Sequence, residues 1–312
     1  MVKPLKFAAK GVIPATLVAF DDAFEIDVAA SRKHLRDVAN VAGLSAITVN
    51  GHASEIHAFD FTEQRRLLAT SLDEVGDEIP LVNGIYADGS AAAVQLARMA
   101  SDEGASALLV FPPNSMSMGG QMRPEMAVRH FEMIADATDL PLILFQYPAV
   151  TGLGYRFETM LEIFDRVPSI VAIKDWSNDA MLHEKHIRSF QSLPRPVNVL
   201  TTHSSWLMAS LSLQPAGLLS GAGSVIADLQ VELFTAMEQH DLATARAVND
   251  RIYPIAQAFY SAPFLDMHNR MKECLVLLGR LDKAIVRPPL MKLTADEIAH
   301  LRQALVAAGL LN

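Results

Sequence analysis

Hydrophobic residues in this chain form short apolar runs that alternate with longer stretches in which apolar positions recur every three or four residues. Short apolar runs bounded by Gly or Pro are typical of buried parallel strands, and the longer period is typical of amphipathic helices. The expected strands are Val12–Val18, Ala46–Asn50, Leu81–Ile85, Ala107–Phe111, Leu142–Gln146, Ile170–Lys174, Val197–Thr201 and Gly217–Ser220. The helices expected between them include Asp27–Ala42, Thr62–Val75, Ala91–Glu103 and Glu125–Thr138.

This alternation predicts an α/β fold, a (β/α)8 TIM barrel. A doubly wound open sheet is the alternative, but it would more often carry a Gly-rich dinucleotide-binding loop early in the chain. After residue 225 the pattern changes to helical segments without a clear strand. We therefore expect a barrel over residues 1–225 and a C-terminal helical extension over residues 226–312, packed beside the barrel. The expected helices of the extension are Leu229–His240, Leu242–Tyr260, Pro263–Leu278 and Ala295–Ala308.

Charge and composition exclude several classes of protein. The chain of 312 residues has a net charge of −9, which argues against a nucleic-acid partner. No apolar stretch approaches the ~20 residues that a membrane span needs, and the first ten residues lack the apolar core of a secretory signal. We expect a cytoplasmic protein without a membrane partner. Its one cysteine, Cys274, lies in an apolar run and is expected to be buried, so no disulfide or cysteine metal site is predicted.

Lys174 is the strongest candidate for chemistry. It closes the apolar run Ile170–Lys174, whereas most other lysines lie near the termini or on helical segments. Active sites of TIM barrels lie at the C-terminal ends of the strands. A lysine there is partly desolvated, which lowers its pKa and frees the neutral amine to form an imine with a ketone. A lysine that only extends its amine to solvent is the competing interpretation from position alone.

Two other strand ends carry polar residues of interest. The second strand is followed by Gly51, His52, Ala53, Ser54 and Glu55, a loop of small residues that is able to present N–H groups to a carboxylate. The fifth strand ends in Phe145-Gln146-Tyr147-Pro148, followed by Thr151-Gly152.

Together with Lys174 on the sixth strand, these segments resemble the dihydrodipicolinate synthase/N-acetylneuraminate lyase family of class I aldolases. The resemblance covers nearly the whole chain. It implies a cofactor-free lyase in which Lys174 forms an imine with pyruvate or a related 2-oxo acid. It also implies that Gly51, Ala53 and Ser54 hold the substrate carboxylate and that Glu55 braces their loop. An aldehyde is the possible second substrate, and relatives are commonly homotetramers or dimers.

The chain departs from the family at the position of the family's catalytic tyrosine, where it has Phe145. Phenylalanine has no proton to transfer. Tyr147 follows two residues later on the same face of the strand, so it is able to replace the lost hydroxyl; an apolar wall residue is the alternative. His52 stands where the family has a hydroxyl, and an imidazole suits proton transfer near neutral pH. A structural role for His52 in the loop is the competing interpretation.

Other departures concern the second substrate. The carboxylate-binding arginine of the synthase aligns with Val150, which argues against aspartate semialdehyde and against authentic dihydrodipicolinate synthesis. A Met-rich loop after the fourth strand, with Trp176 and Trp206, suggests a more apolar or aromatic aldehyde, and core filling is the plainer explanation. Ser220, Phe145 and His203 are further candidates for contact with the substrate.

Three alternatives remain open at this stage. A 2-oxo-3-deoxy acid dehydratase would use the same imine. A degenerate member that binds a 2-oxo acid without turnover is suggested by Phe145. A metal-dependent aldolase would need clustered ligands; His183 and His186 are three residues apart, and we interpret them as part of a solvated helix rather than a metal site.

Overall fold

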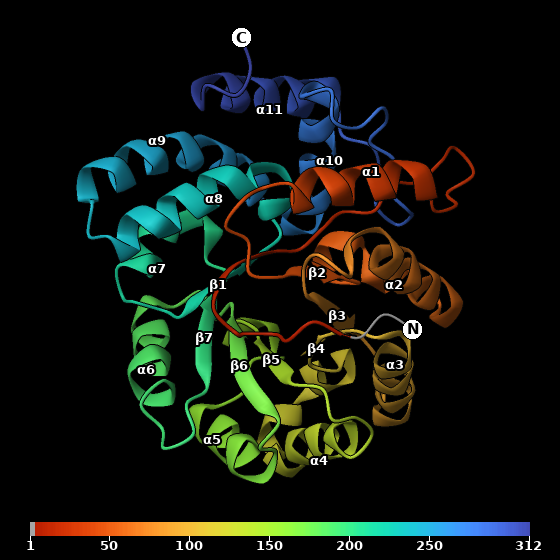
Figure 1. Ribbon diagram of the computed structural model, residues 1–312, viewed down its shortest axis with the longest axis vertical. Helices are drawn as coiled ribbons and strands as arrows, with labels where there is room; N and C mark the ends of the chain where they lie inside the picture. The colour runs from red at the N-terminus through yellow and green to blue at the C-terminus, as the bar shows by residue number, and fades with distance from the viewer. Residues whose placement is uncertain (1–3) are drawn as a thin grey trace.

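Eight parallel strands form a single sheet that curls into a barrel in the computed structural model, which describes residues 4–312 (Figure 1). The predicted TIM barrel with additional C-terminal helices is thereby confirmed. Three strands have the predicted bounds, and the others differ by up to four residues at an end. The strands are β1 (Gly11–Pro14), β2 (Ile47–Val49), β3 (Leu81–Ile85), β4 (Ala107–Val110), β5 (Leu142–Gln146), β6 (Ile170–Asp175), β7 (Asn198–Thr201) and β8 (Gly217–Ser220).

Strand β1 closes the barrel. It pairs along its length with β8, and parallel bridges from Val12 to Leu44 and from Ala15 to Thr48 join it to the β2 side. The predicted strand continued to Val18, but β1 ends at Pro14. Beyond that point the backbone N–H groups of Leu17 and Ala19 donate to the side chains of His34 and Ser31 instead of to a neighbouring strand.

The barrel helices lie outside the strands, and their starts follow the local sequence. Asp27 caps α1, and Asp60 forms a capping box with Glu63 at the start of α2, so that side chains satisfy N–H groups that have no partner within the helix. The helices are α1 (Val28–Ala39), α2 (Phe61–Val75), α3 (Ser90–Glu103), α4 (Pro124–Ala135), α5 (Phe157–Arg166), α6 (Ala180–Phe190), α7 (Leu207–Leu211) and α8 (Gly223–Glu238).

The C-terminal region adds α9 (Leu242–Phe259), the short 3-10 turn η7 (Phe264–Asp266), α10 (Met267–Leu277) and α11 (Ala295–Ala307). Helix α9 packs on α8, and α11 packs on α9 and α10 (Figure 1). The boundary predicted after residue 225 falls inside α8. Cys274 is buried in α10, as predicted. Among residues 4–312, no helix combines the length and the apolar character that crossing a bilayer requires.

Candidate active site

Lys174 is the penultimate residue of β6, at the C-terminal end of the barrel. In register it lies between Phe145 of β5 and Leu200 of β7. Its side chain is 4% exposed, and its Nζ lies 4.1 Å from the centroid of the Phe145 ring. Across residues 4–312 no carboxylate pairs with this amine and no acceptor binds it. Lys174 is therefore a buried amine without a compensating charge, which is costly for the ammonium form.

Burial lowers the pKa of Lys174 to about 7. At neutral pH a large fraction of the side chain is therefore the uncharged amine, which is the form that attacks a carbonyl carbon. The other titratable side chains that line the same cavity are His52, Tyr260 and His268. A carboxylate that would hold the amine in its charged form is absent from the lining that the structure describes.

A cavity opens beside Lys174 at the C-terminal ends of the strands. The barrel contributes Lys174 and His52, together with Ala15, Ala53, Phe145, Trp176, Thr202 and Gly221. The C-terminal region contributes Tyr260, Phe264, Met267 and His268. The extension thus takes part in the site in addition to packing beside the barrel.

Two residues with left-handed backbone conformation bound the loop after β2. Asn50 has φ 51° and Glu55 has φ 60°. Asparagine tolerates this conformation, and its amide donates to the Gln64 carbonyl and to Asn83 Oδ1, both at 2.8 Å. Gly84 leaves room for the turn, because a Cβ there would lie 1.8 Å from the Asn50 carbonyl oxygen. These contacts turn the chain so that His52 and Ala53 face the cavity.

Glu55 sits behind this loop in a fully buried ion pair with Lys272 of α10. Its other carboxylate oxygen accepts the N–H of Arg287 at 3.0 Å, and the Lys272 ammonium also donates to the Ile285 carbonyl at 2.7 Å. The sequence indicated a bracing role for Glu55. The structure shows the contacts through which it ties the loop to the C-terminal region.

His52 and Tyr147 were alternative candidates for proton transfer, and the structure joins them. Tyr147 Oη lies 3.2 Å from His52 Nε2. Only His52 lines the cavity; Tyr147 is buried behind it, with its ring 4.6 Å from that of Phe145. Burial, with Lys174 and His57 nearby, lowers the pKa of His52 to about 3, and burial raises that of Tyr147. Both side chains are therefore uncharged at neutral pH.

The comparison with known proteins agrees with this geometry. Residues 8–308 match the Dihydrodipicolinate synthetase family. The chain belongs to this family. It is 28% identical over 301 residues to an uncharacterised DapA-like lyase of Halobacterium salinarum, covering 96% of this chain and 94% of that protein. It is 26% identical to the 4-hydroxy-tetrahydrodipicolinate synthase of Methanopyrus kandleri, covering 98% of each.

Among solved structures, the fold is similar to that of YagE, an Escherichia coli K12 prophage protein of the dihydrodipicolinic acid synthase family crystallised with pyruvate. The TM-score is 0.88 at 23% identity, covering 97% of this chain and 99% of that one. This member of the dihydrodipicolinate synthetase family is thus an aldolase-type lyase. Its fold and its family agree with the resemblance seen in the motifs.

The predicted carboxylate-binding residues of this family member differ in their surroundings. Ala53 lines the cavity, whereas Gly51 and Ser54 lie behind it. The Ser54 hydroxyl donates to the Thr16 carbonyl at 2.8 Å and thereby anchors the loop to the chain after β1. The backbone N–H groups of His52 and Ala53 find no protein acceptor within residues 4–312.

Ser220 and His203 lie outside the lining of the cavity. Ser220 is fully buried at the end of β8, where its hydroxyl bonds Ser204 at 2.8 Å and receives the Gln230 amide at 3.1 Å. His203 is stacked on Trp206, with ring centroids 4.3 Å apart, and accepts the Asn178 N–H at 3.1 Å. Both side chains therefore bond protein groups around the site, and their expected contacts with the substrate stay predictions.

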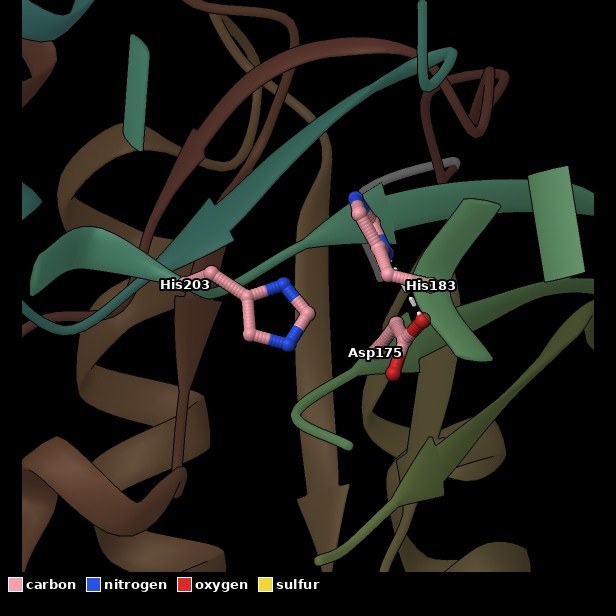
Figure 2. Close-up of side chains that lie close together, drawn as sticks. All are labelled: Asp175, His183 and His203. Atoms are coloured by element: carbon pink, nitrogen blue, oxygen red, sulfur yellow. Dashed lines mark hydrogen bonds and ion pairs between the residues drawn. The ribbon is translucent and has the colours of Figure 1, made fainter. Parts of the chain in front are cut away.

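His183 and His186 are also placed differently from the prediction. Both are fully buried, and each Nδ1 bonds Asp175 Oδ2, at 2.8 and 2.9 Å. Figure 2 shows His183 and His203 on two sides of the Asp175 carboxylate. The interpretation as a solvated helix is wrong, because His183 and His186 are buried on a face of α6 that bonds Asp175 at the end of β6. Burial by itself would raise the pKa of Asp175. The hydrogen bonds from His183 and His186 outweigh burial and hold this pKa well below its usual value.

Atoms of Asp175, His183 and His203 lie within 4.8 Å of one another, a spacing that raises the question of a metal ion. Their polar atoms are already paired with each other or with neighbouring groups, since His183 Nε2 bonds Ser210 Oγ at 2.9 Å and Asp175 Oδ1 accepts the Ser177 N–H at 2.8 Å. A zinc ion at about 2.0–2.1 Å from each ligand would need the directly bonded Asp175 and His183 atoms to move apart. The cluster fits a hydrogen-bond network that anchors the chain just after Lys174.

The sequence did not single out the contributions of the C-terminal region. Residues 267–275 of α10 are all buried, and His268, Met271, Lys272 and Leu275 share one helix face at spacings of three and four. A histidine and a lysine on a face otherwise apolar were a signal for a site or an ion pair. His268 lines the cavity and Lys272 binds Glu55.

The lowered pKa of Lys174 predicts how imine formation depends on pH. The neutral amine is the nucleophile, so trapping of the imine should rise about tenfold between pH 6 and pH 8, with its midpoint near pH 7. The rate of reductive trapping at subsaturating pyruvate measures this dependence. A midpoint above pH 9 would show that the amine is not desolvated as the structure describes.

Proposed function

We propose that this lyase forms a Schiff base between Lys174 and pyruvate or a related 2-oxo acid, without a separate cofactor. The observation that carries the proposal is the unpaired, buried amine of Lys174 at the base of a cavity at the C-terminal ends of the strands. The protonated imine withdraws electrons from the adjacent carbon, which favours the enamine needed for making or breaking a carbon–carbon bond. The N–H groups of His52 and Ala53 are the proposed donors to the substrate carboxylate.

We propose further that the His52–Tyr147 pair takes the place of the family tyrosine. Phe145 stands in that tyrosine's position and lines the cavity with an apolar ring. His52 is the group of the pair that reaches the substrate, and Tyr147 holds its Nε2. In this arrangement His52 is the catalytic residue and Tyr147 is a positioning residue.

An activity different from dihydrodipicolinate synthesis is supported by the cavity walls. Among the described residues that line the cavity there is no Arg, Asp or Glu, and Val150 is 93% exposed at the position aligned with the synthase arginine. A second substrate with a charged carboxylate would meet no counter-charge apart from the lysine that forms the imine. Dehydration of a 2-oxo-3-deoxy acid is the second candidate, since it uses the same imine.

The test is borohydride reduction of the intact protein in the presence of pyruvate, followed by mass spectrometry. We expect an adduct of pyruvyl mass on the peptide that contains Lys174. An unmodified, folded protein after trapping with pyruvate and with longer 2-oxo acids would rule the proposal out. An adduct without turnover across a broad panel of aldehydes and 2-oxo-3-deoxy acids would instead favour a non-catalytic 2-oxo acid binding protein.

The oligomeric state stays a prediction: the resemblance to the family implies a homotetramer or a dimer.

A further inference from the structure

His268 is a buried side chain that the proposed chemistry does not use. It stands at the start of α10 and is 5% exposed, and it lines the cavity together with Lys174. Its ring makes an edge contact with the ring of His52, with centroids 5.7 Å apart. In the part of the chain that the structure describes, neither ring nitrogen has a hydrogen-bond partner. Because an unpaired buried imidazole is costly, such a group is expected to meet a ligand or water.

The C-terminal residues that line the cavity beside His268 are aromatic or apolar. Tyr260, Phe264 and Met267 flank it on the C-terminal side of the cavity. Phe264 stacks on Trp176, with ring centroids 5.0 Å apart, and on Tyr260, with centroids 5.6 Å apart. The rings of Trp176, Phe264 and Tyr260 together form an aromatic wall of the cavity, and none of these three residues is Asp, Glu, Lys or Arg. Burial, with His52, His57, Lys272 and Lys174 nearby, holds the pKa of His268 well below its usual value, so the imidazole is neutral.

We propose that His268 binds the second substrate, an uncharged apolar or aromatic aldehyde, and donates a hydrogen bond to its carbonyl oxygen. The aldehyde's apolar group packs against the aromatic wall of Trp176, Phe264 and Tyr260. This inference rests on the proposed imine chemistry at Lys174. It adds the chemical class of the partner and the residue that orients it.

The bond changes in the condensation direction are balanced without any redox partner. The enamine carbon of the Lys174-bound pyruvate forms a bond to the aldehyde carbon, and the carbonyl π electrons move to the aldehyde oxygen. The proton that left the pyruvyl methyl group ends on that oxygen, and water then cleaves the imine. The products are a 4-hydroxy-2-oxo acid and free Lys174. His268 stabilises the charge that develops on the oxygen and keeps its own proton.

The test compares aldehydes and His268 variants in the full-length enzyme. With pyruvate in excess, formation of the 4-hydroxy-2-oxo acid is measured for benzaldehyde, glyceraldehyde and succinate semialdehyde. We expect kcat/KM for benzaldehyde to exceed that for each of the other two by about 10²-fold. His268→Phe keeps an aromatic ring but removes the donor, and it should lower kcat/KM for benzaldehyde by about 10- to 10²-fold. His268→Gln, which restores a donor, should recover part of the loss.

Pyruvate trapping separates this inference from the proposed function. His268→Phe should trap pyruvate on Lys174 within about twofold of the wild-type rate, which also shows that the variant is folded. The exposed His300 of α11 provides a matched control, and His300→Phe should leave both measurements unchanged. An unaltered kcat/KM for benzaldehyde in His268→Phe, or a wild-type preference for the charged or polyhydroxylated aldehyde, overturns the inference alone. Failure of the wild type to trap any 2-oxo acid overturns the proposed function itself.

Discussion

Replacement of Lys174 by alanine is expected to abolish both turnover and borohydride trapping, with a loss of at least about 10³-fold in kcat. The physical reason is that no other lining residue in the described chain carries an amine, so the imine has no alternative site. The fold should survive, because the Lys174 amine makes no hydrogen bond or ion pair within residues 4–312, so its removal leaves no buried polar group without a partner. Circular dichroism and the unfolding midpoint measure the fold, and mass spectrometry measures the adduct.

Two further variants make the Lys174 result specific. Lys174→Met keeps the volume of the side chain and should be as inactive as the alanine variant, which excludes a packing defect as the cause. Lys185→Ala changes an exposed lysine on α6 and should retain full trapping. Residual trapping in Lys174→Met at the wild-type rate would show that the imine forms on a different lysine.

His52→Leu is expected to lower kcat by about 10²-fold while pyruvate trapping persists, because proton transfer follows formation of the imine. Tyr147→Phe should cost about tenfold, since Tyr147 acts through the 3.2 Å contact with His52 and not on the substrate. The double variant should be no slower than His52→Leu, because removal of His52 also removes the role of Tyr147. Steady-state kinetics of the three variants, set against trapping, measures the pair.

Tyr155 offers a matched control for Tyr147. It is equally enclosed, but its buried hydroxyl has no hydrogen-bond partner. Tyr155→Phe removes an unsatisfied polar group and should therefore leave kcat unchanged and stability unchanged or improved. If the effects of His52→Leu and Tyr147→Phe add in full, the two side chains act independently and the proposed pair is wrong.

The fold was predictable to a large degree because its signals are local. Gly and Pro at strand entries, apolar runs and helix caps each act within a few residues, and eight such units restrict the architecture to few choices. β1 is the instructive exception. Its apolar run continues to Val18, yet its backbone donors turn to His34 and Ser31 on α1, which a one-dimensional pattern does not reveal.

The candidate site was predictable only where a residue's role follows from its position on a strand. Lys174 is such a residue, because it ends an apolar run that predicts a buried strand, and a lysine at that position is expected to be partly desolvated. His203 and Ser220 follow strand ends as well, but hydrogen bonds to Asn178 and to Ser204 hold them outside the cavity lining. The buried His183 and His186 were misjudged because the acceptor on which their placement depends, Asp175, lies on a different element.

The sequence by itself determined the barrel, the helical C-terminal region and the lysine at the end of the sixth strand. Only the tertiary structure decided that His52 and Tyr147 form one pair, that Lys272 neutralises Glu55, and that His268 completes the cavity. The first two contacts join residues separated by 95 and 217 positions. Such contacts depend on how the whole barrel closes and on where α10 docks, whereas the place of Lys174 at the end of an apolar run is a local feature of the sequence.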